Sequence, residues 1–314
     1  MLRSQSGFCT VLSGGREHLC KLRGRLKQGR QRSRTVAVAG DRVSFRLVAD
    51  AGGDTPSGVV EAVLPRDNKI SRSSSRRDRG RKEQVLMANL DQIVVVQSVR
   101  QPAPMKGFVD RLLAAAEHYG VDGLLCLNKI DLDATAAADA RWDYYAGIDY
   151  RLLRTSAETG EGVDAFHEAL RGRISLLLGA SGTGKTSLLA RATGLELEVG
   201  DVTEKTGLGR HTTTRTELFP IGDGGFIADS PGIRGFDPWE VGTADLRNLF
   251  PDFLAPAAEC RFTTCLHRDE PACGVKAAVQ DGMIPVWRHE AYLLILGDLE
   301  ASESERGPRR RKRE

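Results

Sequence analysis

Residues 179–187, Gly-Ala-Ser-Gly-Thr-Gly-Lys-Thr-Ser, have the types and spacing that bind a nucleoside triphosphate. Glycines at these positions let backbone N–H groups crowd around a β-phosphate, and a following helix adds partial positive charge at its N-terminus. We expect Lys185 to reach the β- and γ-phosphates and Thr186 to ligate Mg²⁺. The loop stands between an apolar run at 174–178 and a helical pattern at 186–192, the context that a phosphate loop requires.

The base is indicated by Asn128-Lys129-Ile130-Asp131, which follows an apolar run at 124–127. The Asp131 carboxylate can accept hydrogen bonds from the ring N–H and the exocyclic amine of guanine, whereas adenine would leave it desolvated without partners. Asn128 would contact the base and brace neighbouring loops, and the Lys129 stem would cover the purine ring. The motif predicts GTP and disfavours an ATP-dependent kinase or ATPase.

Two further segments end predicted strands in the same region. Thr155-Ser156-Ala157 would bring a backbone N–H at Ala157 to the guanine O6. Asp229-Ser-Pro-Gly232 follows an apolar run at 225–228, where the aspartate would hold Mg²⁺ through water and the glycine N–H would sense the γ-phosphate. Each segment is weak evidence alone, but together they indicate one nucleotide site.

The catalytic group is less well defined by the sequence. Ras-like enzymes carry a water-orienting glutamine directly after the Asp-x-x-Gly glycine, and this chain has Ile233 there. Intrinsic turnover should therefore be slow, and another group or a partner must complete the site. His211 is the candidate, although an exposed histidine with no catalytic part fits the sequence equally well. Among the threonines at 212–214 we assign Thr213 to Mg²⁺, and the other two stay open.

The order of these motifs differs from that of a Ras-like GTPase. A Ras-like chain runs phosphate loop, switch threonine, Asp-x-x-Gly, Asn-Lys-x-Asp and Ser-Ala, whereas this chain begins with Asn-Lys-x-Asp and Ser-Ala. The sequence therefore predicts a circularly permuted GTPase, which is tolerated because domain termini lie close together at the surface. The predicted GTP-binding residues are Asn128, Lys129, Ile130, Asp131, Ser156, Ala157, Gly179, Ala180, Ser181, Gly182, Thr183, Gly184, Lys185, Thr186, Ser187, Asp229 and Gly232.

Three cysteines and one histidine cluster near the C-terminus. Cys260, Cys265, His267 and Cys273 supply three thiolates and one imidazole, a complete tetrahedral set for one structural Zn²⁺ per chain. Four protein ligands leave no open coordination position, so a catalytic zinc is not expected. The other three of the six cysteines are scattered, which does not suit a disulfide framework.

Alternating strands and helices must position the nucleotide motifs. Between residues 93 and 192 apolar runs alternate with helical patterns, which predicts a parallel α/β sheet covered on both faces. The strands are expected at 93–97, 123–127, 152–155 and 174–178, and the helices at 108–118, 135–145, 162–170 and 186–192. Earlier strands at 35–39, 43–48 and 58–64 suggest a small β-barrel, followed by a linker or loop at 71–82. A long helix is expected at 285–300 and a basic, disordered tail at 306–314.

Charge is distributed unevenly along the 314 residues. Residues 1–90 contain 19 Lys and Arg against 8 Asp and Glu, and the remainder contains 26 against 34. The basic excess suggests a polyanion partner, although the densest run, at 72–82, could equally be a solvated, disordered arm. No apolar stretch has the length of a signal peptide or a membrane span, so a cytoplasmic protein without membrane contact is expected.

Permuted motifs, a preceding basic β-barrel and a following Cys/His cluster resemble the small-ribosomal-subunit-dependent GTPases of the RsgA/YjeQ family. The resemblance implies an OB-fold RNA-binding domain at 1–85, a permuted GTPase domain at 86–236, a helical zinc-binding domain at 237–300 and a tail at 301–314. It implies a monomer that binds the 30S subunit and its 16S rRNA late in maturation, with hydrolysis stimulated by that subunit. An RNA-binding assembly factor that uses GTP only as a structural ligand is the alternative.

Overall fold

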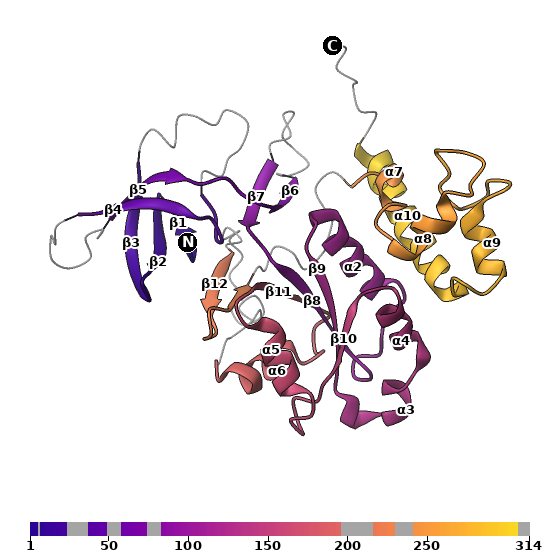
Figure 1. The fold of residues 1–314 in the computed structure, drawn as a ribbon, viewed down its shortest axis with the longest axis horizontal. Coiled ribbons are helices and arrows are strands. Elements are labelled where there is room, and N and C mark those ends of the chain that lie inside the picture. The colour runs from indigo at the N-terminus through magenta and orange to yellow at the C-terminus, as the bar shows by residue number, and fades with distance from the viewer. Residues whose placement is uncertain are drawn as a thin grey trace, which may run out of the picture.

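The computed structural model describes residues 1–5, 7–23, 37–48, 58–73, 83–195, 216–229 and 241–306. Within these ranges the chain forms an N-terminal sheet, a central sheet covered by helices and a C-terminal helical unit (Figure 1). None of the helices in the described ranges combines the length and the apolar character needed to cross a bilayer.

The N-terminal sheet contains five short strands in the order β1-β2-β3-β5-β4. Their bounds are Arg3–Gln5 (β1), Phe8–Ser13 (β2), Arg16–Leu22 (β3), Val43–Leu47 (β4) and Gly58–Val63 (β5). A tight turn at Gly14 and Gly15 joins β2 to β3, and both glycines have a positive φ that other residues adopt only with strain. Alternate side chains of these strands, including Cys9, Val11 and Cys20, form a small core. The sheet therefore has its own apolar interior.

The sequence predicted this region only in part. Strands were expected at 43–48 and 58–64, where β4 and β5 lie, but β1, β2 and β3 were not foreseen. Their alternating pattern is weak because Cys9 and Cys20 take buried positions that β-branched or aromatic residues usually hold, and because β3 begins with the polar run Arg16-Glu-His. The strand expected at 35–39 is wrong in its described residues, since only Ala39 forms a β-bridge, to Met87.

A two-stranded hairpin follows, made of β6 (Lys69–Ser73) and β7 (Glu83–Ala88). The linker expected at 71–82 is strand at 71–73, and residues 74–82 lie outside the described ranges. Ile70 and Met87 are buried in the same core as the central sheet. The predicted domain boundary at residue 85 therefore falls inside β7, on a hairpin that packs with the central sheet.

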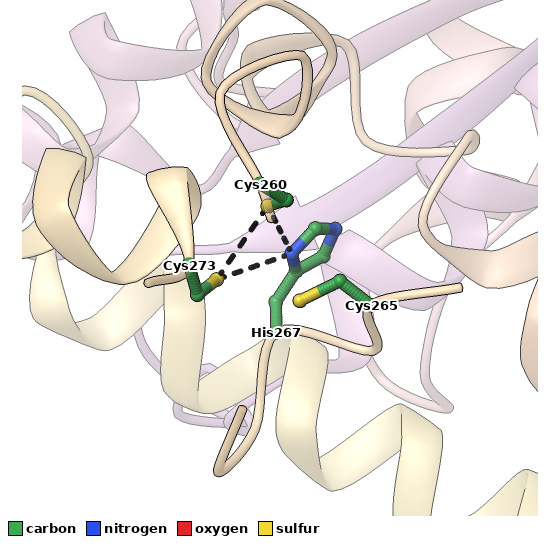
Figure 2. A group of neighbouring side chains, drawn as sticks. All are labelled: Cys260, Cys265, His267 and Cys273. Carbon is green, nitrogen blue, oxygen red and sulfur yellow. Dashed lines mark hydrogen bonds between the residues drawn. The ribbon is translucent and has the colours of Figure 1, made fainter. Parts of the chain in front are cut away.

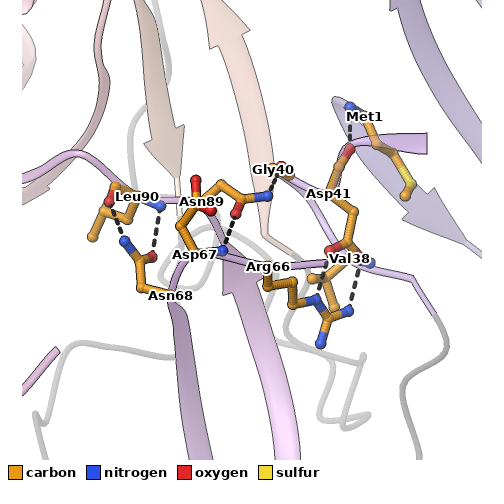
Figure 3. Close-up of polar contacts among 9 residues, drawn as sticks. All are labelled: Met1, Val38, Gly40, Asp41, Arg66, Asp67, Asn68, Asn89 and Leu90. Carbon is orange, nitrogen blue, oxygen red and sulfur yellow. Dashed lines mark hydrogen bonds and ion pairs between the residues drawn. The ribbon is translucent and has the colours of Figure 1, made fainter. Parts of the chain in front are cut away.

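Polar contacts tie this hairpin region to the N-terminal sheet (Figure 3). The buried carboxylate of Asp41 accepts two hydrogen bonds from the Arg66 guanidinium, at 2.6 and 2.7 Å, and one from the Val38 N–H at 2.8 Å. The Asn89 side-chain amide donates to the Gly40 carbonyl at 2.9 Å. A bidentate arginine compensates a buried carboxylate well, so this junction fixes how the chain enters the central sheet.

The central sheet has six strands in the order β10-β9-β8-β11-β13-β12. Their bounds are Gln92–Ser98 (β8), Asp122–Asn128 (β9), Arg151–Arg154 (β10), Ile174–Leu178 (β11), Glu217–Pro220 (β12) and Phe226–Asp229 (β13). All neighbours are parallel except β12 and β13, which form an antiparallel pair. Every residue of β8 is buried, as expected for the middle of a parallel sheet covered on both faces.

Helices cover both faces of this sheet (Figure 1). Their bounds are Phe108–Tyr119 (α2), Ala134–Ala137 (α3), Ala140–Gly147 (α4), Val163–Leu170 (α5) and Lys185–Thr193 (α6). Val95 of β8 packs in one core with Leu113 of α2 and Trp142 of α4, whereas Val94 packs in another with Phe166 of α5. Successive strand residues thus serve opposite faces.

The single helix expected at 135–145 is wrong. The chain forms α3 and α4 there, each with its own aspartate cap. Asp133 accepts a hydrogen bond from the Ala136 N–H at 2.9 Å, and Asp139 accepts one from the Arg141 N–H at 2.9 Å. The Asp139 side chain bonds a backbone N–H at the start of α4, and this cap favours a new helix start over continuation of α3. The cap explains why the helix is interrupted.

The C-terminal unit contains four helices in its described residues. They are Thr243–Leu246 (α7), Pro251–Ala257 (α8), Gly274–Gln280 (α9) and Val286–Arg306 (α10). α10 continues six residues beyond the predicted domain boundary at 300, so residues 301–306 are helix and not tail. The Glu303 carboxylate accepts hydrogen bonds from the Thr243 N–H and hydroxyl at 3.1 and 3.3 Å, which ties the last turns to α7.

Candidate functional site

The predicted nucleotide-binding segments meet at one edge of the central sheet. The Asn-Lys-x-Asp segment begins at the last residue of β9, the Ser-Ala segment follows β10 and the phosphate loop follows β11. These strands run parallel within one sheet, so their carboxyl ends lie at the same edge. Segments that are far apart in the sequence are thereby brought together.

Two glycines of the phosphate loop, Gly179 and Gly184, lie so close to neighbouring atoms that a side chain there would clash with them. A Cβ added at Gly179 would lie 2.2 Å from the Val96 carbonyl oxygen. Gly184 has a φ of +87°, and a Cβ there would lie 2.5 Å from Asn128 Nδ2. The loop is therefore packed directly against β8 and against the Asn-Lys-x-Asp segment.

The first turn of α6 and the Lys185 side chain supply positive charge at the loop. Gly184 is the N-cap of α6, and no side chain caps that end of the helix. Lys185 Nζ donates to the carbonyls of Gly179 and Ala180 at 3.0 and 2.9 Å. Thr186 and Ser187 lie in the first turn. An ammonium and a helix N-terminus converge here, which is the arrangement that favours a phosphate.

Asn128 joins the two loops expected to bind the base, 128–131 and 155–157 (the base-side loops), to the phosphate loop. Its fully buried side chain donates from Nδ2 to the Thr183 carbonyl at 3.0 Å. Its Oδ1 accepts from the Thr155 hydroxyl at 3.1 Å and from the Ala157 N–H at 3.3 Å. One amide therefore braces the loops that follow three different strands, in agreement with the bracing role predicted for it.

Asp131 and Ser156 form a second contact between base-side loops. The Ser156 hydroxyl donates to Asp131 Oδ1 at 2.5 Å and accepts from the Thr159 N–H at 3.0 Å. Asp131 is exposed and Ser156 is buried, so the serine holds the carboxylate at the open side of the sheet edge. Ile130 is buried and Ala157 is half-buried.

Several predicted residues lie outside the described ranges. These are His211, Thr213 with its neighbours at 212 and 214, and Gly232. Asp229 is the last residue of β13, next to β11, and its side chain also falls outside the description. Their assigned parts in Mg²⁺ binding, γ-phosphate sensing and catalysis stay predictions.

Cys260, Cys265, His267 and Cys273 lie together in the C-terminal unit (Figure 2), with their candidate ligand atoms all within 4.8 Å of one another. His267 Nδ1 is 3.6 Å from Cys260 Sγ and 3.4 Å from Cys273 Sγ, and the two sulfurs are 3.8 Å apart. Tetrahedral zinc, with bonds of about 2.3 Å to sulfur and about 2.0 Å to nitrogen, requires separations of about 3.8 Å between sulfurs and about 3.5 Å between sulfur and nitrogen. The donor set therefore fits zinc in identity, and the separations among Cys260, His267 and Cys273 fit it in spacing, with Cys265 within 4.8 Å of the others.

Burial sets the protonation of these groups in the metal-free chain. It raises the pKa of the Cys265 thiol to about 12, raises the pKa of Cys273 and lowers the pKa of His267. The Cys265 and Cys273 thiols are then protonated and the imidazole is neutral at pH 7, so metal binding must displace the protons of these two thiols. His267 Nε2 is buried with no hydrogen-bond partner, while Nδ1 faces the sulfurs. Nδ1 is thus the nitrogen available as ligand.

Comparison with known proteins identifies the family. The model for RsgA GTPases matches residues 63–239. A small ribosomal subunit biogenesis GTPase RsgA of Moorella thermoacetica is 37% identical over 304 residues, covering 96% of this chain and 97% of the relative. The chain belongs to the RsgA GTPase family. Another relative of the same name, from Chlorobaculum tepidum, is 39% identical over 270 residues, 85% of this chain and 86% of its own.

Solved structures of RsgA-type proteins have the same architecture. YjeQ from Thermotoga maritima superposes with a TM-score of 0.73 at 31% identity, covering 95% of this chain and 96% of that protein. YloQ, described as a circularly permuted GTPase, gives a TM-score of 0.71 at 25% identity, covering 98% of this chain and 95% of that protein. The permuted, multidomain GTPase fold predicted from motif order is therefore confirmed.

One contact at the nucleotide site of this RsgA-family chain was not predicted. Lys129 Nζ donates at 2.6 Å to the Gly182 carbonyl of the phosphate loop and at 2.6 Å to the Gln101 carbonyl. Gln101 lies in the segment between β8 and α2, which follows a strand end as the other binding loops do. The signal was present in the sequence, since Gln101-Pro-Ala-Pro begins three residues after Ser98, the end of the buried strand, but it matches no nucleotide motif.

Proposed function

We propose that this protein hydrolyses GTP as a biogenesis factor of the small ribosomal subunit, and that the subunit stimulates the hydrolysis. The carrying observation is the Asn128 side chain, which bonds the phosphate loop and both base-side loops at one sheet edge. The relatives named above are small ribosomal subunit biogenesis GTPases, which supplies the partner.

Guanine would be bound by the Asp131 carboxylate, held in place by Ser156, and by the Ala157 N–H, which would exchange Asn128 Oδ1 for the guanine O6. The Lys129 stem would cover the purine while its ammonium stays on the Gly182 carbonyl. Adenine offers this arrangement no donor for the carboxylate, and the resulting loss of about 1–3 kcal/mol or more favours GTP.

The phosphates would lie over residues 179–187, where Lys185 exchanges its two loop carbonyls for the β- and γ-phosphates. Mg²⁺, held by Thr186 and Thr213 with Asp229 through water, would neutralise charge on the β- and γ-oxygens. Gly232 would sense the γ-phosphate, and His211 is the candidate for orienting the attacking water because Ile233 cannot.

A structural zinc would organise the C-terminal unit. Its support is the donor set Cys260, Cys265, His267 and Cys273 with the spacing of a tetrahedral site. A bound metal of this kind contributes folding free energy directly, about 10–16 kcal/mol in isolated finger peptides at neutral pH. We therefore assign the region from α7 to α10 as a helical zinc-binding domain.

The N-terminal sheet would be the RNA-binding part, an OB-fold that contacts 16S rRNA. Its support is a set of short strands with exposed basic side chains on β3 and just after it, at Arg16, Lys21 and Arg23. Phosphate contacts from such side chains bind RNA without base specificity. We propose that the protein acts as a monomer.

One observation favours a second candidate function. Ile233 stands where a water-orienting glutamine is expected, so GTP could serve as a structural ligand of an RNA-binding assembly factor. Such a factor would bind GTP and the subunit without turnover.

GTP hydrolysis with and without purified 30S subunits separates the two candidates. The proposed function predicts slow turnover alone and a clear acceleration with subunits. Lys185→Ala is the matched control, since its ammonium donates to carbonyls of its own loop and its loss should leave the fold intact. Turnover that is equal with and without subunits would support the structural-ligand alternative.

A further inference from the structure

The segment at 99–107 contacts both the nucleotide site and α10 of the C-terminal unit. Its front touches the site, because the Gln101 carbonyl and the Gly182 carbonyl share the Lys129 ammonium at 2.6 Å each. A Cβ at Gly182 would also lie 3.5 Å from Pro102 Cδ. The Ser98 hydroxyl donates to the Pro102 carbonyl at 2.7 Å, which fixes the segment at the end of β8.

The back of the same segment rests on α10. Gly107 is the N-cap of α2 with a φ of +70°, and a Cβ there would lie 3.0 Å from Leu294 Cδ2. One residue earlier, Lys106 pairs with Glu290 of α10 at 2.7 Å. The segment is therefore held between Lys129 on one side and α10 on the other.

A buried ion network holds α10 in this position. Arg288 of α10 is 1% exposed and donates to Asp110 of α2 at 2.6 Å and to Asp252 of α8 at 2.9 and 3.1 Å. The Tyr145 hydroxyl of α4 donates to the same Asp110 carboxylate at 2.9 Å, and that of Tyr144 donates to Asp252 at 2.9 Å. Arg288 therefore joins α10 to α2 and α8, and its two carboxylate partners also accept hydrogen bonds from the tyrosines of α4.

We propose that α10 is a positioning element for the guanine site, acting through Arg288, Leu294 and the 99–107 segment on Lys129. When α10 lies against α2, the segment presents the Gln101 carbonyl and holds the lysine across the purine position. When α10 is displaced, Lys129 loses one of its two carbonyl partners and the site loses preorganisation. The inference rests on the proposed function, because it takes guanine nucleotide as the ligand.

The effect of α10 on nucleotide affinity should differ from the effect of a device that senses the γ-phosphate. Lys129 lies on the base side, and GDP and GTP carry the same base, so α10 should change the affinity for both by the same factor. A device that senses the γ-phosphate would instead change the ratio of the two affinities. By linkage, a partner that pulls α10 from α2 would weaken GDP and GTP binding alike and so promote nucleotide exchange.

Nucleotide affinities of full-length variants without ribosomes test the proposal. Arg288→Lys keeps the charge but cannot reach both carboxylates, and Leu294→Ala removes the side chain behind Gly107. Each should weaken binding of fluorescent GDP and of a fluorescent non-hydrolysable GTP analogue by about 3- to 30-fold, equally for the two. Val286→Ala is the matched control, since it truncates an apolar residue of the same helix that is 60% exposed.

A double-mutant cycle separates positioning from simple destabilisation. In a Lys129→Met background, Arg288→Lys and Leu294→Ala should each change GDP affinity by less than about twofold, because the group that they position is gone. Zinc content and the thermal midpoint report whether Arg288→Lys has folded, and if it has not, the mostly surface change Leu294→Ala decides.

Wild-type affinity for both nucleotides in Leu294→Ala and in folded Arg288→Lys would overturn the proposal. A change in the affinity for the GTP analogue alone would also overturn it, as would affinity losses that add fully to those of Lys129→Met. Absence of GDP binding by the wild-type protein would instead overturn the proposed function, so the two failures are distinguishable.

Discussion

Replacing Asn128 by aspartate tests the brace on which the nucleotide site depends. The change is isosteric and keeps an acceptor for the Thr155 hydroxyl and the Ala157 N–H, but it replaces the donor that faces the Thr183 carbonyl 3.0 Å away. Loss of that hydrogen bond costs about 1 kcal/mol, and opposing two buried acceptors costs about 1–3 kcal/mol more. The sum of about 2–4 kcal/mol corresponds to about 30- to 700-fold in an equilibrium constant.

This cost is divided between folding and binding, so two assays are needed. The brace is formed without nucleotide, and a loss expressed in stability lowers the thermal midpoint by about 2–4 °C per kcal/mol for a domain of about 150–250 residues. The remainder appears as weaker binding of fluorescent GDP. Asn128→Ala is the comparison, because it removes all three bonds without adding a buried charge. An Asn128→Asp protein with wild-type midpoint and wild-type GDP affinity would refute the bracing role.

Three further predictions concern the base, the metal and the RNA surface. Asp131→Asn should lower GTP affinity by about tenfold or more and favour xanthosine nucleotides, because an amide donates where the carboxylate only accepts; unchanged GTP preference in a competition assay would contradict this. Zinc binding to metal-free protein at pH 7 should release at least about two protons, since burial raises the pKa of Cys265 to about 12 and that of Cys273 above its ordinary value. Calorimetry in buffers of different ionisation enthalpy measures the number of protons released, and the zinc affinity should fall as the pH falls. A zinc affinity that does not depend on pH would argue against thiolate ligation. Replacing Arg16, Lys21 and Arg23 by glutamine should lower the salt slope of 30S binding by about 1 for each RNA phosphate that is no longer neutralised, and an unchanged slope would remove the N-terminal sheet from the interface.

The nucleotide edge was predictable because parallel strands dictate where their following loops lie. Asn128, Ser156 and Gly184 each stand at or soon after the end of an apolar strand, and the physics of a parallel sheet brings them to one edge whatever their order in the chain. The Cys/His set was predictable for a similar reason, since its ligand chemistry and spacing are local in the sequence.

The contacts between the parts of the chain were not predictable. Arg288 pairs with Asp110 across 178 residues and with Asp252 across 36, and no periodicity or motif joins three such positions. A lone charged residue in a helical pattern is usually solvated, so its burial depends on partners that only tertiary packing supplies. The extension of α10 past residue 300 has the same origin, because Glu303 is fixed by Thr243 of another helix.

Binding of full-length protein to 30S subunits in defined nucleotide states tests the central claim most directly. If the subunit stimulates hydrolysis, as proposed, because it binds the GTP form preferentially, then GTP must favour subunit binding by the same factor by which the subunit favours GTP. Binding to 30S subunits should be markedly tighter with a non-hydrolysable GTP analogue than with GDP. Equal affinity in the two nucleotide states would contradict it.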